Sequence, residues 1–87
     1  MSVDMLEKKD NLKELVDFVV KHLVDNPDKV NVSVVNGEQA TIIELKVAQA
    51  DLGKVIGKQG RTAKALRTLI HGIATKQRKR AILEILE

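Results

Sequence analysis

Two runs of alternating aliphatic residues, joined by a turn-forming pair, set the strongest limit on how this 87-residue chain can fold. The first run, VNVSVV, places valine at every second position, and the second, ATIIELKV, aligns Ile43, Leu45 and Val47. This period is typical of strands with one buried face. The pair Asn36-Gly37 favours a two-residue hairpin turn. We therefore expect an antiparallel hairpin with Val30 opposite Ile43.

Apolar residues at helical spacing predict the helices. These helices cover residues 12–24, a short stretch that follows Asp51 and breaks at Gly57, and about 61–76. Asp10 or Asn11 can cap the first helix, and Asp51 can cap the second.

The order of the elements predicts the topology. A strand over 40–47, two helices and a strand over 81–86 make a crossover unit, so these two strands should be parallel. The expected fold class is α+β with the order α-β-β-α-α-β. Three helices should cover one face of a three-stranded mixed sheet.

Positive charge is concentrated in one segment. Residues 51–80 carry nine Lys or Arg against Asp51 alone, whereas residues 1–50 carry six Lys against nine acidic residues. A local excess of this kind indicates a site for a polyanion. A solvated basic helix face is the alternative.

The remaining composition limits the class of protein. The length allows one core, so we expect a single domain over 1–87 with a disordered tail of about eight residues. The chain lacks Cys, and His22 and His71 have no second ligand at metal spacing, so neither a metal nor a cofactor is expected. No nucleophile–base pair is visible, so we expect no enzyme. Without a signal peptide or a run of ~20 apolar residues, a cytoplasmic protein with no membrane partner is expected.

The basic segment contains a glycine-framed turn, Gly57-Lys58-Gln59-Gly60, between two predicted helices. Gly57 can adopt positive φ, and Gly60 allows another backbone to approach closely. The second helix begins here, so free N–H groups and the positive end of its dipole favour a phosphate. Phe18 is the only aromatic residue, so contacts to nucleic acid should be aliphatic and electrostatic rather than stacking.

These features carry a family resemblance. VIGKQGRT resembles the IGxxG signature of the KH domain, and the element order resembles its type II form. The longer string DLGKVIGKQGRTAKALRTLI is similar to the small bacterial KhpA proteins, and the resemblance extends from Leu12 to Leu86. It implies that the GxxG turn grips the backbone of single-stranded RNA, about four nucleotides per domain.

The resemblance and the local charge together define the expected RNA-binding residues. Val55, Ile56 and Leu66 would form a groove wall, and the basic segment 75–80 would reach the same RNA. The full set is Lys54, Val55, Ile56, Gly57, Lys58, Gln59, Gly60, Arg61, Thr62, Lys64, Leu66, Arg78, Lys79 and Arg80.

The long helix has an apolar arc wider than one sheet face needs, with Ala65 and Leu69 at its edge. A wide core stripe is one interpretation, and a dimer interface is the other. The resemblance implies a homodimer or a complex with a larger RNA-binding protein, KhpB. It also implies roles in RNA chaperoning, cell elongation and envelope homeostasis. The alternatives are a protein-interaction module whose GxxG turn binds no RNA and a binder of phosphate-containing metabolites.

Overall fold

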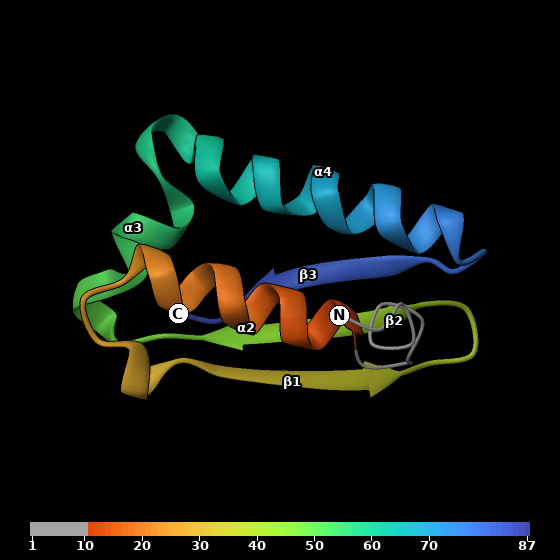
Figure 1. The fold of residues 1–87 in the computed structure, drawn as a ribbon, viewed down its shortest axis with the longest axis horizontal. Helices are drawn as coiled ribbons and strands as arrows, with labels where there is room; N and C mark the ends of the chain where they lie inside the picture. Colours follow the sequence, from red (N-terminus) through yellow and green to blue (C-terminus); the bar gives the residue numbers. More distant parts are fainter. Residues whose placement is uncertain (1–10) are drawn as a thin grey trace, which may run out of the picture.

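Three helices lie on one side of a three-stranded sheet in a computed structural model that describes residues 11–87 (Figure 1). The helices are α2 (Asn11–Leu23), α3 (Leu52–Ile56) and α4 (Arg61–Lys76), and the strands are β1 (Asn31–Asn36), β2 (Thr41–Lys46) and β3 (Ala81–Ile85). Short 3-10 turns cover Pro27–Lys29, Gln49–Asp51 and Lys58–Gly60. The predicted order of helices and strands is confirmed. The predicted tail and the capping by Asp10 or Asn11 lie outside the described residues and side chains.

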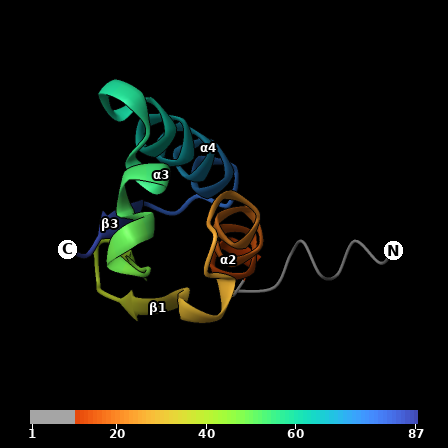
Figure 2. The same ribbon diagram turned by 90° about the vertical axis from the view of Figure 1, so that its left-hand side faces the viewer.

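The sheet has the order β1-β2-β3, with β1 antiparallel to β2 and β2 parallel to β3. The predicted mixed sheet and the parallel pair are therefore confirmed. The helices cover the same face, and the two-helix crossover through α3 and α4 connects β2 to β3 (Figure 2). None of the helices in residues 11–87 has the length and apolarity needed to cross a membrane.

The predicted register of the hairpin is wrong. Val34, not Val30, lies opposite Ile43, and Asn36 is the last residue of β1, opposite Thr41. The Gly37 N–H donates to the Ala40 carbonyl at 2.9 Å, which pairs these two residues and places the turn at Glu38 and Gln39, two residues beyond the predicted turn. A shift of four residues leaves each side chain on its original face, so the alternating pattern could not distinguish the two registers.

The core forms between the sheet and the helices. Ile43 and Leu45 of the central strand are fully buried, as expected for the middle of a sheet with one covered face. The other core side chains are aliphatic and come from the three helices, from β1 and β3 and from the residue after α2: Leu12, Val16, Val20, Val24, Val32, Val55, Leu66, Ile70, Ala74 and Leu83. Because Val55 belongs to this cluster, the short helix α3 is anchored to the core immediately before the glycine turn.

Candidate nucleic-acid interface

Backbone conformation sets the shape of the GKQG turn. Gly57 has φ 80° and ψ 170°, Gln59 has φ 57°, and Gly60 has φ 75°. A Cβ at Gly57 would overlap the Thr62 Oγ1 and lie 2.8 Å from the Thr62 backbone nitrogen. Gly57 is therefore required both by its φ and by the close approach of Thr62. At Gly60 a Cβ would meet no atom within 4 Å, so the turn is open on that side.

Hydrogen bonds inside the turn use two of its backbone N–H groups. The Gly60 N–H donates to the Gly57 carbonyl at 3.1 Å, and the Arg61 N–H donates to the Lys58 carbonyl. Fewer N–H groups are therefore free than a helix start by itself suggests. No side chain caps the start of α4. Lys58, Gln59 and Arg61 are exposed, so both cations and the positive end of the α4 dipole face solvent.

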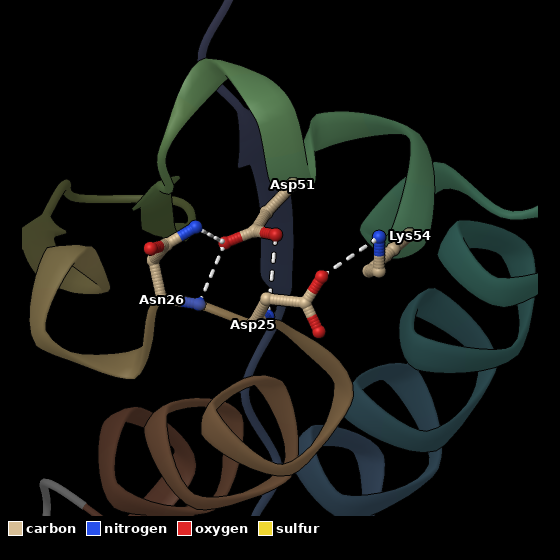
Figure 3. A network of polar contacts seen from close by, with 4 residues as sticks. All are labelled: Asp25, Asn26, Asp51 and Lys54. Atoms are coloured by element: carbon tan, nitrogen blue, oxygen red, sulfur yellow. Dashed lines mark hydrogen bonds and ion pairs between the residues drawn. The ribbon is translucent and has the colours of Figure 1, made fainter.

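A buried carboxylate holds the segment that leads into the turn. Asp51 is 1% exposed and has the predicted N-cap position of α3, but its side chain makes no capping hydrogen bond to this helix. It accepts hydrogen bonds from the Asp25 N–H at 3.2 Å, the Asn26 N–H at 3.0 Å and the Asn26 Nδ2 at 3.0 Å (Figure 3). Asp51 therefore joins the start of α3 to the chain that follows α2.

The pKa of Asp51 is lower than its usual value of 3.8. Burial acts to raise this pKa, but the hydrogen bonds from the Asn26 side chain and from the backbone N–H groups of Asp25 and Asn26, with the charge of Lys54, outweigh it. The ionised form is therefore the one that the folded chain stabilises.

Lys54 lies beside this network. Its Nζ is 3.3 Å from the Asp25 Oδ2 (Figure 3). Both side chains are exposed, so the ion pair is weak and can exchange for a phosphate contact. Among the basic residues predicted to bind RNA, Lys54 is the one with an ionic partner within residues 11–87.

Two of the three residues predicted to form an apolar groove wall are buried in the core. Val55 and Leu66 are 0% and 5% exposed, so their side chains support the turn from the core. Ile56 and Thr62 are half-buried and lie on either side of the turn. Aliphatic contact with a ligand would therefore fall mainly to Ile56.

The predicted basic residues form two groups rather than one. Lys58, Arg61 and Lys64 are exposed at the start of α4, whereas Arg78, Lys79 and Arg80 are exposed beyond its end (Figure 1). The sixteen residues of α4 place the two groups about 24 Å apart. The second group lines a pocket with the hairpin turn, including Asn36, Glu38 and Gln39.

Ala65 and Leu69 are exposed, and Leu69 is 55% exposed. The buried residues of α4 are Ala63, Leu66, Ile70 and Ala74. Of the two interpretations of the apolar arc, the one that places Ala65 and Leu69 in a core stripe is therefore wrong. Their place in a dimer interface stays a prediction.

Two structural contacts were not expected from the sequence. One is the set of hydrogen bonds to Asp51 described above. The other joins α4 to the sheet: the Nε of Arg67 donates to the Leu83 carbonyl of β3 at 3.3 Å. Neither pair is close in sequence, so no local pattern could indicate them. No group of three or more His, Asp or Glu side chains within residues 11–87 is placed to hold a metal ion.

The order α-β-β-α-α-β, with a GxxG turn between the two crossover helices, defines a type II KH domain. A family model described as the KH domain of KhpA and KhpB matches residues 13–85. The chain belongs to this KhpA/KhpB KH-domain family.

Curated relatives share most of the chain. The RNA-binding protein KhpA of Clostridium acetobutylicum is 57% identical over 75 residues, which cover 86% of this chain and 100% of the relative. The RNA-binding protein KhpA of Caldanaerobacter subterraneus is 59% identical over 73 residues, covering 84% and 97%. That of Aquifex aeolicus is 57% identical over 76 residues, covering 87% and 96%. These names describe a non-enzymatic function, in agreement with the prediction that the chain is no enzyme. No solved structure matches the chain.

Proposed function

We propose that this chain binds single-stranded RNA, with the GKQG turn as the site for the phosphodiester backbone. The observation that carries the proposal is the open turn itself. Its backbone conformation leaves the Gly60 side clear, and Lys58 and Arg61 stand beside it without an ionic partner within residues 11–87. Membership in a family whose relatives are named RNA-binding proteins supports the same ligand.

The chemistry of the site favours a backbone ligand over a base-stacking one. Phe18, the only aromatic residue, lies on α2 rather than at the turn. Cations, backbone N–H groups and the half-buried Ile56 remain as contacts. Such a site should bind with modest affinity and a steep dependence on salt, because each neutralised phosphate releases counterions.

The finer parts of the proposal extend from the family resemblance. The chain would act in the cytoplasm as an RNA chaperone or post-transcriptional regulator, linked to cell elongation and envelope homeostasis. It would work as a homodimer through Ala65 and Leu69 or in a complex with a KhpB-type partner. The exposed Leu69 supports the dimer part of this proposal.

Fluorescence anisotropy tests the proposed ligand directly. A labelled single-stranded RNA oligonucleotide is titrated with the chain, and the unlabelled single strand and a free mononucleotide serve as competitors. We expect the unlabelled single strand to compete, and the mononucleotide to fail even in large excess. Full competition by the mononucleotide would favour a metabolite binder. An absence of RNA binding at low salt would favour a protein-interaction module.

A further inference from the structure

Arg67 occupies a special position on α4. It lies seven residues beyond Gly60, about 10 Å along the helix axis, between the GKQG turn and the basic group at 78–80. It is exposed, yet its Nε donates to the Leu83 carbonyl at 3.3 Å. None of the other arginines in residues 11–87 makes a side-chain hydrogen bond.

The carbonyl that Arg67 contacts belongs to β3, the edge strand of the sheet that residues 11–87 form. The Thr41 N–H donates to the Arg80 carbonyl, and the Leu86 N–H donates to the Leu45 carbonyl, so residues 80 and 86 direct their backbone groups toward β2. Backbone N–H and C=O groups alternate between the two sides of a strand, so the backbone carbonyl of Leu83 points away from β2. Because β3 is the last strand of the sheet, the Arg67 side chain spans from the helix to an open edge.

This contact orients the guanidinium group. The group is planar and carries five N–H donors, of which the Nε donor is used by Leu83. The two terminal nitrogens have no hydrogen-bond or ionic partner within residues 11–87. An end-on fork of parallel N–H donors is thus available, with its plane restrained by the sheet.

A strand of RNA that contacted both basic groups would pass along α4. The helix contains no acidic residue, and its exposed cations Arg61, Lys64 and Arg67 follow one another at three-residue spacing, so each is a neighbour of the next on the helix surface. A polyanion held at the GKQG turn therefore meets Lys64 and then Arg67 in this direction, with no acidic residue of α4 beside them.

We infer that Arg67 sets the base preference of the chain and favours bases that present two adjacent acceptors. This inference depends on the proposed RNA binding. Guanine offers O6 and N7, and unpaired cytosine offers O2 and N3. On these edges adenine and uracil place an N–H donor beside each acceptor. The fork of Arg67 has only donors, so it cannot make two hydrogen bonds there. Arg67 therefore acts as a specificity residue, whereas the cations at the turn hold the backbone.

The test compares base preference with total affinity. U-rich RNA oligonucleotides, unchanged or with cytosine, guanine or adenine substituted at every third position, are titrated at fixed salt. A good bidentate contact is worth about 1–3 kcal/mol, so the wild type should bind the cytosine or guanine strands about fivefold or more tightly than the unchanged strand. Arg67→Lys keeps the charge but removes the fork. It should reduce that ratio below about twofold and leave the salt slope unchanged.

Arg61→Lys is the matched control for the ratio between strands and not for total affinity, because Arg61 is an exposed α4 arginine at the proposed backbone site without a contact to the sheet. It should leave the ratio intact. A preference that survives Arg67→Lys would overturn the inference, and so would equal wild-type binding to all strands. If the wild type binds none of the strands, the proposed function is overturned as well, so the two failures are distinguishable.

A second measurement does not depend on the folding of the variant. In nitrogen-15 NMR of the wild type, the Arg67 side-chain signals should shift with the cytosine or guanine strands and stay in place with the unchanged strand. Equal shifts with both would contradict the inference.

Discussion

At the scale of single residues, the shape and the charge of the GKQG turn depend on different residues. Gly57 has a backbone conformation open mainly to glycine and lies against Thr62, whereas Gly60 needs only its positive φ. Gln59 holds φ 57° at some cost, in the left-handed region that Asn and Asp enter more readily. Shape is therefore set by the glycines, and charge by the residues around them.

Gly57→Ala should destabilise the chain by about 2 kcal/mol or more, because the new methyl group overlaps Thr62 and the residue must keep an unfavourable φ. Gly53→Ala is the matched control, since a Cβ there meets no atom within 4 Å and Gly53 lies inside α3. It should be neutral or stabilise by up to about 1 kcal/mol. Urea unfolding measures both. Equal stability of the two variants would show that the turn relaxes freely.

Lys58→Asp combined with Gln59→Asp should reduce RNA affinity at least about tenfold, or 1.4 kcal/mol, without unfolding the chain. Both side chains are exposed, so the core packing stays as it is, and the two carboxylates would repel the phosphates. Lys29→Asp with Asn31→Asp makes the same change in net charge at exposed positions outside both basic groups. Gel shifts and circular dichroism provide the readouts. A folded variant with unchanged affinity would remove the turn from the proposed mechanism.

At the scale of elements, the turn is held by connections between segments that are distant in sequence. Asp51 ties α3 to the residues after α2, Val55 anchors α3 in the core, and Arg67 ties α4 to β3. The helices on both sides of the turn are thereby fixed to the rest of the fold. A flexible surface loop would lack such support.

The Asp51 network predicts a specific pH dependence. Its pKa in the folded state is lower than the value of 3.8 expected for the unfolded chain, so the unfolded chain binds the proton more readily. The contribution of Asp51 to stability is therefore fully present above pH 3.8 and is lost as the pH falls through the folded-state pKa. Asp51→Asn should be less stable near neutral pH, and its deficit should shrink in acid. Thermal melts across this range measure the difference. A constant deficit would mean that the charge of Asp51 is irrelevant.

The turn between α4 and β3 predicts a graded effect on RNA binding. Replacing Arg78, Lys79 or Arg80 with Ala, one at a time, should flatten the slope of log affinity against log salt by about 0.7 for each phosphate that the variant no longer neutralises. Because these residues lie about 24 Å from the GKQG turn, the effect should appear only with RNA long enough to follow α4. Wild-type slopes in all three variants on long RNA would identify this segment as a solvated turn.

At the scale of the whole molecule, the chain presents two different surfaces on α4. One carries Lys64 and Arg67, and the other carries Ala65 and Leu69 with Arg61 and Lys76 beside them. A second chain docked on the apolar side would leave Lys64 and Arg67 free for RNA. The fold is therefore compatible with pairing and RNA binding at these two cations together.

Leu69→Asp should dissociate a homodimer and leave the monomer folded. Leu69 is 55% exposed, so the change buries no charge within one chain. Across a two-fold axis, two carboxylates would become desolvated close together, which costs several kcal/mol. Multi-angle light scattering and thermal melting are the readouts, with Leu69→Ala as a milder variant that should only weaken the dimer. A folded Leu69→Asp variant that remains dimeric would place the interface elsewhere.

Much of the architecture follows from local signals in the sequence. The alternation of VNVSVV and ATIIELKV indicated two strands with the correct buried faces, and helical spacing located α2, α3 and α4. The glycines at 57 and 60 indicated the turn, and the positive φ of Gly57 was predicted, whereas the positive φ of Gln59 and of Gly60 was not. These features depend on side-chain periodicity and on the backbone freedom of glycine, which act over a few residues.

Other properties were decided only by the tertiary structure. The hairpin register depends on where the turn falls, at Glu38 and Gln39 rather than at Asn36 and Gly37. The alternating pattern cannot distinguish the two positions, because an even shift keeps every face. Asp51 bonds to Asn26 and Arg67 bonds to Leu83 because packing brings distant segments together. The two basic groups belong to the same basic segment of the sequence, yet they lie at opposite ends of α4 because the helix is a rigid spacer. The sequence by itself thus determined which elements form and where charge accumulates, whereas long-range packing decided which polar groups meet and how far apart the charges lie.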